Sequence, residues 1–437
     1  MHLTWKKSVW WETAFVFLGV LAVYLMSPMS TSFDSRWALA TADSIFHSMD
    51  TDLVEFTDLI EQNEEYGIVR IAGRPYNRHP IGAALVALPF LAVLERFKAL
   101  KIREKIAKGL GGGIERRIAS FVVALTAAVL FATCRRESYG IVVALLTTVV
   151  FAFGTSAWST ASRALWQHGP SMLMIALGHY ALVLARERPR AAALAGLPLA
   201  FAFIVRPTNA IVAAVFSLVV GRKHPRQLAI FLTLLALVLV PFAFYSLNVF
   251  GQLFPPYYSL NAQGMAVSNS YIEALVGQIV SPNRGILVFS PVLLFAIAGL
   301  VMQCREKRVG LVETGLIVSI VANPIVVAAA PMWWGGHSYG PRFFTDVLPF
   351  ACFFLAPFLS AIPTWSLRSQ WIVGLSFALL FAFSVFVHYR GSFEWSVYEW
   401  NTFPINIDED SSRAWDFHDL QFFPCISKLQ ASRPGCL

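Results

Sequence analysis

An acidic residue near the start of a long polar segment is the first candidate for chemistry. Asp34 lies in the segment Ser32-Phe33-Asp34-Ser35-Arg36-Trp37, directly after the first apolar run. A carboxylate at a membrane boundary can take a proton from an attacking hydroxyl, which is the task of a general base. The alternative is a helix N-cap, because a helical pattern follows from Arg36 to His47. Asp50 and Asp52 are the fallback candidates for the base.

Two basic residues end the same polar segment, in Gly73-Arg74-Pro75-Tyr76-Asn77-Arg78-His79-Pro80-Ile81-Gly82. A phosphate leaving group gains negative charge in the transition state, and preorganised cations stabilise that charge. The planar guanidinium of arginine can bind two phosphate oxygens at once. We therefore expect Arg78 and His79 to bind a phosphate, with Tyr76 as a further substrate-site candidate. The alternative is that the basic pair only directs its charges toward water at the membrane interface.

A second concentration of polar and aromatic residues is Trp333-Trp334-Gly335-Gly336-His337-Ser338-Tyr339-Gly340-Pro341-Arg342. Its glycines permit close approach of the backbone. Arg342 begins an apolar run, where an unpaired charge would be costly. We expect this arginine to bind either Asp346, one helical turn on, or a ligand phosphate. His337 and Tyr339 are substrate-site candidates from the same segment.

Four basic residues outside these two segments complete the candidate site. Arg36 can hold the neighbouring Asp34 ionised, whereas the others lie in short polar segments between apolar runs: Arg163, His168 and Arg206. The sequence Asp50-Thr51-Asp52 resembles a metal-binding Asp-x-Asp, but no other cluster of hard ligands accompanies it. No metal or other cofactor is therefore predicted, and a divalent cation is kept as the alternative.

The composition is that of a membrane protein. Of 437 residues, 57% are hydrophobic and 14% are charged, and apolar runs of roughly 17 to 22 residues recur along the chain. The net charge of +8 comes without an aromatic-interleaved basic tract, so we expect anionic membrane lipids and no nucleic acid as partners. Within Lys98–Arg117, lysines recur on one helical face. This pattern predicts that the face either binds anionic lipid headgroups or is simply exposed to water.

The apolar runs predict an all-α polytopic protein of about eleven transmembrane helices. Lys6 and Lys7 place the N-terminus inside, and the run Ile81–Leu94 is too short to span. With that run excluded, later basic clusters fall on the cytoplasmic side, as the positive-inside rule requires. The expected spans are 12–29, 118–134, 139–157, 170–185, 191–205, 207–220, 228–248, 285–303, 310–330, 344–361 and 371–388.

This topology divides the chain into a transmembrane module, residues 1–388, and a short extracytoplasmic tail, residues 389–437. The first extracytoplasmic loop, residues 30–117, contains the interfacial helices and Asp34. The C-terminus lies outside, where Cys425 and Cys436 are expected to form a disulfide.

These segments together resemble the GT-C glycosyltransferases. They are most similar to the branch that contains protein O-mannosyltransferases and the lipid A aminoarabinose transferase. The similarity lies in the order of three features: a long outer first loop, an early Asp followed by Arg and an aromatic residue, and then Gly-Arg-x-Tyr-x-x-x-Pro-x-Gly. The resemblance implies a polyprenyl-phosphate-linked sugar donor, inversion at the anomeric carbon, and no metal. Asp34 would be the first-loop catalytic acid and His79 the basic residue that contacts the donor phosphate. Relatives often carry two adjacent acids, whereas Ser35 follows Asp34 here.

The leading hypothesis is therefore a glycosyltransferase of the bacterial inner membrane, with its active site on the extracytoplasmic face. It would move a sugar from a polyprenyl-phosphate carrier to an extracytoplasmic glycan, lipid or protein acceptor. The alternatives are a transporter or flippase of a lipid-linked saccharide, and a catalytically inactive lipid-binding relative. Transporters place charges near mid-bilayer and show repeated halves. Here the polar groups gather at one face and no repeat is visible, which favours the enzyme.

Overall fold

A computed structural model describes residues 7–31, 33–96, 101–258, 270–330 and 332–424. The chain divides into two compact units. We call Ser30–Val123 with Ser162–Met265 the loop unit, and Met1–Met29, Ala124–Ala161 and Ala266–Leu437 the tail unit. The helix α6, Gly112–Arg136, contributes residues to both.

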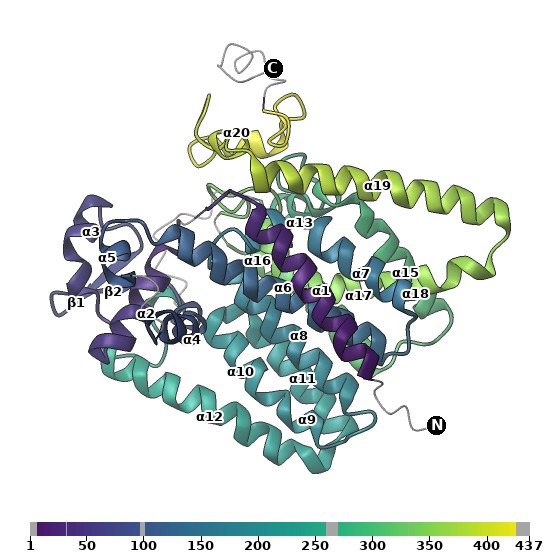
Figure 1. The fold of residues 1–437 in the computed structure, drawn as a ribbon, viewed down its shortest axis with the longest axis horizontal. Helices are drawn as coiled ribbons and strands as arrows, with labels where there is room; N and C mark the ends of the chain where they lie inside the picture. Colours follow the sequence, from purple (N-terminus) through teal and green to yellow (C-terminus); the bar gives the residue numbers. More distant parts are fainter. Residues whose placement is uncertain (1–6, 32, 97–100, 259–269, 331, 425–437) are drawn as a thin grey trace. The chain divides into compact units, whose positions relative to one another are not determined.

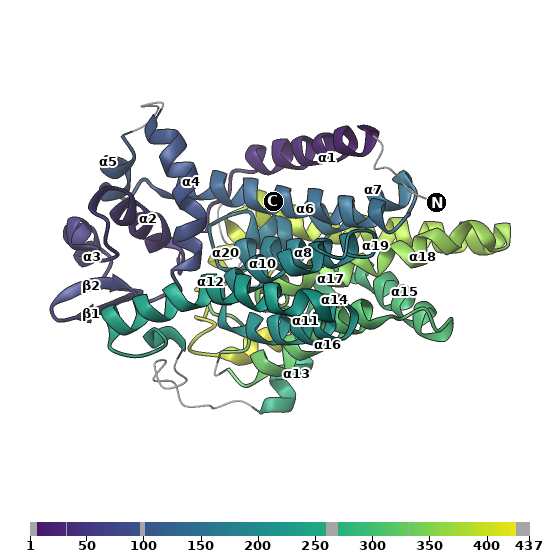
Figure 2. The same ribbon diagram turned by 90° about the horizontal axis from the view of Figure 1, so that it is seen from below.

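The loop unit combines short helices from the first polar loop with a group of apolar helices. Among the latter, α8, α10, α11 and α12 lie side by side (Figures 1 and 2). The elements are α2 Arg36–Ser48, η1 Val54–Phe56, α3 Thr57–Gln62, β1 Ile68–Ile71, β2 Arg74–Asn77, α4 Gly82–Arg96, α5 Ile102–Ala107, α8 His168–Leu184, α9 Ala191–Leu194, α10 Gly196–Val205, η3 Pro207–Asn209, α11 Ala210–Lys223, α12 Pro225–Phe250 and η4 Pro256–Tyr258.

A tight hairpin joins α10 to α11, as the sequence predicts. Arg206 is extended, with φ −150° and ψ 119°, because a following proline disfavours helical backbone. The side chain of Asn209 donates to the carbonyl of Ala202 at 2.9 Å and to Ser171 Oγ at 2.8 Å. These bonds fix the turn against α8 and α10, so Arg206 has a defined position.

The strands β1 and β2 form a small antiparallel hairpin that the sequence did not predict. Ile68 pairs with Asn77 and Ile71 with Arg74. Ala72 and Gly73 between them both have positive φ, 50° and 81°, which is the backbone of a tight two-residue hairpin turn. The hairpin ends directly before Arg78 and His79 and therefore sets their position.

The helix α4 corresponds to the run that we expected not to span. It has 15 residues, with Pro89 inside it, so its length is about 22 Å against a hydrocarbon core of about 30 Å. The helix expected after it is shorter than the lysine pattern indicated. Among the described residues between α4 and Gly111, the structure has one helix, α5, which is six residues long and buries Ile102 and Ile106. Arg116 and Arg117 belong to α6 instead, and Lys98 lies outside the described residues.

The tail unit is also almost entirely helical. Within it, α13 packs on α16, α15 on α18, and α7 on α17. Its elements are α1 Lys7–Met26, α7 Ile141–Phe153, the π-helix η2 Ala157–Ala161, α13 Tyr271–Val280, α14 Ile286–Phe289, η6 Pro291–Leu293, α15 Leu294–Arg305, α16 Leu311–Ala328, η7 Arg342–Val347, α17 Leu348–Phe353, α18 Leu355–Ala361, η8 Ile362–Thr364, α19 Leu367–Phe393, α20 Ser396–Glu399 and η9 Ser411–Trp415.

Six helical segments in the described part of the chain are long and apolar enough to cross a membrane. They are Ser8–Met26, Gly112–Arg136, Pro225–Phe250, Leu311–Ala328, Arg342–Thr364 and Leu367–Phe393. Other expected spans occur as shorter or interrupted helices. The run 285–303, for example, is broken at Ser290 and Pro291 between α14 and α15.

A buried arginine holds the segment after α19 to the rest of the tail unit. Arg284 is 2% exposed, and its Nε donates to the carbonyl of Trp334 at 2.7 Å. Its other nitrogens donate to Asn401 Oδ1 at 2.8 Å and to Gln421 Oε1 at 2.5 Å. Each of these acceptors is a neutral oxygen. Asn401 and Gln421 are therefore part of the core of this unit.

Candidate functional site

Asp34 lies in the turn before α2. The residue directly before the helix is Ser35, and its side chain makes no capping hydrogen bond. Asp34 is therefore not at the N-cap position that the alternative interpretation gave it. Its Oδ1 accepts a 2.5 Å hydrogen bond from the hydroxyl of Tyr66. This bond fixes one carboxylate oxygen to a residue that lies 32 positions further along the first loop.

Tyr66 and Gly67 connect the candidate base to the basic pair. The Tyr66 carbonyl accepts from Trp37 Nε1 at 2.6 Å, and the Gly67 carbonyl accepts from the backbone N–H of Arg78 at 2.8 Å. Gly67 has φ +77°, and a Cβ there would lie 3.2 Å from Trp37 and 3.6 Å from His79 Nε2. A glycine is thus needed where Trp37 and His79 approach the same backbone. Neither Tyr66 nor Gly67 carries a sequence pattern that predicts a site residue.

The basic pair itself is held from two sides. The backbone N–H of His79 donates to Asn77 Oδ1 at 3.0 Å, and its ring centroid lies 5.5 Å from that of Tyr257. The Nε of Arg78 is buried without a hydrogen-bond partner among the described residues. A buried donor of this kind is costly unless a ligand satisfies it. An oxygen-rich ligand next to Arg78 would do so.

Tyr76 and Arg36 support this loop from either side. Tyr76 pairs with Val69 in the hairpin and lies against Phe250, with ring centroids 6.0 Å apart, and burial raises the pKa of its hydroxyl. The Arg36 guanidinium donates to Asn63 Oδ1 and lies 5.8 Å from the centre of the Tyr66 ring. Arg36 therefore contacts the residue that binds Asp34.

Arg206 and His168 form a second basic group in the loop unit. Arg206 NH1 lies 3.4 Å from Nδ1 and 3.5 Å from Nε2 of His168, which is the geometry of a guanidinium lying against an imidazole ring. A Cβ on Gly82 would lie 2.6 Å from the Cα of Val205. The start of α4 therefore touches the end of α10, and the chain segments of His79 and Arg206 meet there.

Arg163 occupies a packed position. It is fully buried, and its NH2 donates to Ser162 Oγ at 3.0 Å and to Ser120 Oγ at 3.4 Å. Its carbonyl accepts from the backbone N–H of Thr31 at 3.4 Å. Arg163 thus connects the start of the first loop to α6, and its geometry favours a supporting role over substrate contact.

The remaining candidates lie in the tail unit. His337 Nε2 is 2.8 Å from Asn406 Oδ1 and 3.5 Å from Asp408 Oδ2, so tail residues orient this imidazole. Arg342 NH1 donates to the carbonyl of Gly335 at 3.1 Å. A phosphate contact of Arg342 stays a prediction.

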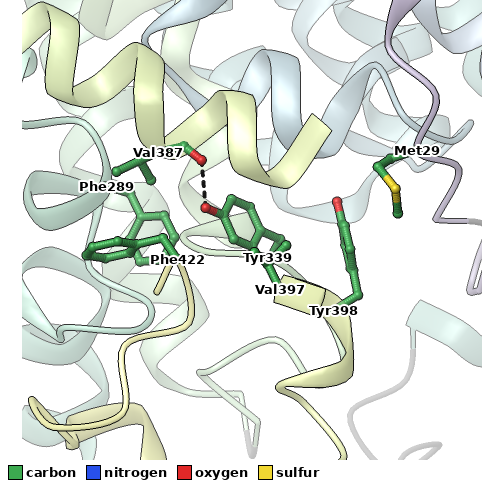
Figure 3. Close-up of a cluster of buried hydrophobic side chains, with 7 residues drawn as sticks. All are labelled: Met29, Phe289, Tyr339, Val387, Val397, Tyr398 and Phe422. Atoms are coloured by element: carbon green, nitrogen blue, oxygen red, sulfur yellow. Dashed lines mark hydrogen bonds between the residues drawn. The ribbon is translucent and has the colours of Figure 1, made fainter. Parts of the chain in front are cut away.

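Tyr339 lies inside an apolar cluster with Phe289, Val387 and Tyr398 (Figure 3). Its hydroxyl donates to the carbonyl of Val387 at 2.6 Å, and a Cβ on Gly391 would meet its ring at 2.4 Å. This placement favours packing over substrate contact.

The fallback carboxylates differ from Asp34 in their surroundings. Asp52 is buried and pairs with Arg74 at 2.8 Å, and its Oδ1 accepts from the backbone N–H of Val54. Partial burial and the neighbouring Asp52 and Glu55 raise the pKa of Asp50. No group of three His, Cys, Asp or Glu residues that could hold a metal ion occurs in the described part of the chain. Cys425 and Cys436, the expected disulfide, lie outside it.

No family model and no curated protein matches the sequence. Two solved structures do match, both of ArnT from Cupriavidus metallidurans. For the structure bound to undecaprenyl phosphate, the TM-score is 0.56 at 16% identity, over 84% of this chain and 62% of that chain. For the apo structure, the TM-score is 0.53 at 15% identity, over 89% of this chain and 70% of that chain. The chain thus spans less than two thirds of the first of these proteins. At such identities the likeness shows the fold alone, and the fold of this chain is similar to that of ArnT.

Proposed function

We propose that the chain is an integral membrane glycosyltransferase that uses a polyprenyl-phosphate-linked sugar. The acceptor is an extracytoplasmic glycan, lipid or protein, and the membrane is the bacterial inner membrane. The likeness to a protein solved with undecaprenyl phosphate supports the class of donor. The observation that carries the proposal is the Tyr66–Gly67 link, because it joins a carboxylate and a basic pair within one unit.

The proposed reaction is a single inverting displacement. The acceptor hydroxyl loses its proton to Asp34, and its oxygen attacks the anomeric carbon of the donor sugar. The bond from that carbon to the phosphate oxygen breaks, and the phosphate leaves with the electron pair. Arg78 and His79 stabilise the charge that develops on the phosphate. Tyr66 acts as a positioning residue, because its hydroxyl orients the Asp34 carboxylate.

The test is transfer by the purified protein in lipid nanodiscs. Undecaprenyl phosphate carrying radiolabelled glucose, mannose or aminoarabinose is added, and sugar released from the carrier is measured. Release by the wild type that is lost in Asp34→Asn supports the proposal. Movement of the intact carrier across the bilayer of proteoliposomes, without sugar release, would favour the transporter. Binding of the carrier with neither release nor movement would favour the inactive relative.

A further inference from the structure

Five basic side chains lie at the end of the loop unit that is opposite to Arg206 along α10. They come from the link between α8 and α9 and from the corner between α11 and α12: Arg188, Arg190, Arg222, Lys223 and Arg226. All five are exposed, and none forms a hydrogen bond or an ion pair with another described residue. Glu187 is the only acidic residue between Ser138 and Ile272, so this part of the sequence supplies little counter-charge. We call the five residues the basic corner, and the proposed reaction does not use it.

The two halves of the basic corner lie on neighbouring helices. A Cβ on Gly196 of α10 would lie 2.4 Å from the carbonyl oxygen of Phe231 on α12, so the two helices touch there. Because α11 returns between them, α10 and α12 run in the same direction (Figure 1). From that contact, Arg190 lies six residues back along the chain and Arg226 five residues back, or about 9 Å and about 7.5 Å in helical geometry. The two arginines therefore lie at nearly the same level, which agrees with the packing of α9 on α12.

Each of these arginines has an exposed aliphatic side chain one helical turn further along. Leu194, four residues after Arg190, is 56% exposed. Ile230, four residues after Arg226, is 53% exposed. Residues four apart lie on the same face of a helix, and α12 buries little of its apolar surface. On both helices, a positive charge at the end and apolar surface directly beside it thus face the surroundings together.

This combination suits the headgroup and acyl chains of an anionic lipid. A guanidinium can bind two phosphate oxygens at once, and basic clusters next to a membrane helix attract anionic headgroups. Basic residues also determine the topology of membrane proteins, so positive charge alone would not indicate a ligand. The adjacent leucine and isoleucine make the difference, because a soluble anion needs no apolar surface.

We propose that the basic corner binds an anionic phospholipid. The arginines and Lys223 contact the phosphates, and the acyl chains lie along Leu194 and Ile230. With the expected topology, this lipid belongs to the cytoplasmic leaflet. The assignment is independent of the proposed reaction and holds for a transporter or an inactive relative as well.

The test measures how much cardiolipin stays bound to the full chain in a mild detergent, by native mass spectrometry. Cardiolipin is the probe because it is an anionic phospholipid with two phosphates, and zwitterionic phosphatidylcholine is the comparison. We expect the wild type to bind cardiolipin at least about tenfold more tightly than phosphatidylcholine. Equal binding of the two lipids would overturn the proposal.

The first variant, Arg190→Gln with Arg226→Gln, removes two cations of the basic corner. Each basic residue near an anionic surface is worth about fivefold in affinity, so we expect roughly thirtyfold weaker cardiolipin binding. Arg305→Gln with Lys307→Gln is the matched control, because both residues are exposed, are expected on the same side of the membrane, and lower the net charge equally. This control should bind cardiolipin like the wild type. An equal loss in the control would mean that only the overall charge matters, and the site would be rejected.

The second variant, Leu194→Gln, tests the apolar part of the site. It keeps all five cations and with them the charges that direct membrane insertion, so it can be measured even if the arginine variant does not insert. We expect at least about threefold weaker cardiolipin binding, because the acyl chains lose apolar contact. Leu375→Gln is its control, since Leu375 is 63% exposed on α19.

Two outcomes would contradict the lipid assignment in particular. One is wild-type cardiolipin affinity in Leu194→Gln. The other is displacement of cardiolipin from the wild type by inorganic phosphate at the same phosphate concentration, which would show that the basic corner binds a soluble anion instead.

Discussion

The hydroxyl of Tyr66 donates a 2.5 Å hydrogen bond to Oδ1 of Asp34, across 32 residues of the first loop. An amide oxygen at the same position can still accept this bond. Substitution of Asp34 by Asn therefore removes the ability to take a proton and keeps the contact that holds the loop. This separates the chemistry of Asp34 from its structural role.

We expect Asp34→Asn to lower single-turnover transfer by at least about a hundredfold, because a general base contributes typically about 10²–10⁴ in rate. Donor affinity and thermal stability should stay near the wild-type values. Asp52→Asn is the control. This variant loses the ion pair with Arg74, which should lower the free energy of unfolding by about 1 kcal/mol. The folded fraction of the variant should transfer sugar at the normal rate. Normal turnover of Asp34→Asn beside an inactive Asp50 or Asp52 variant would place the base elsewhere in the loop.

We expect Tyr66→Phe to give a smaller loss of rate than Asp34→Asn. The carboxylate remains able to accept a proton but loses the donor that orients it. The loss should appear in the maximal rate and not in donor affinity, because Tyr66 has no assigned contact with the donor. Equal losses in Tyr66→Phe and Asp34→Asn would mean that the tyrosine takes part in the chemistry itself.

We expect His79→Ala and Arg78→Ala each to weaken donor binding by about ten- to a hundredfold. Loss of a charge-assisted contact to phosphate costs on the order of 1.5–3 kcal/mol. Arg74→Gln is the matched control from the same segment, since the Arg74 side chain is 64% exposed and pairs with Asp52. Titration with undecaprenyl phosphate measures the effect. Wild-type affinity in both variants would restrict the pair to an interface role.

We expect Tyr339→Phe to lower stability by about 1 kcal/mol, because the carbonyl of Val387 loses its donor. Transfer by the folded protein should not change, since the hydroxyl lies inside an apolar cluster (Figure 3). Thermal unfolding beside a transfer assay checks both parts. A large loss of transfer rate without loss of stability would indicate that Tyr339 contacts the substrate.

The sequence predicted the helices well where apolar runs are long. It also placed the hairpin turn at Arg206 correctly, because Pro207 and Asn209 act on nearby backbone. The partner of Asp34 was not predictable in this way. Tyr66 and Gly67 lie in a polar stretch without periodicity, and their bonds to Asp34, Trp37 and Arg78 depend on chain folding over long separations. The β-hairpin was missed because each of its strands has only four residues.

The buried position of Arg284 has a consequence for how the chain is made. Its partners Asn401 and Gln421 follow it by 117 and 137 residues. At 5–20 residues per second, the ribosome needs roughly 7–27 s to reach Gln421 after Arg284. During that interval a cation without its final acceptors must remain hydrated or be held by the insertion machinery. The tail unit therefore completes its core only after Gln421 has been made, and truncation within residues 401–421 should lead to degradation of the whole chain.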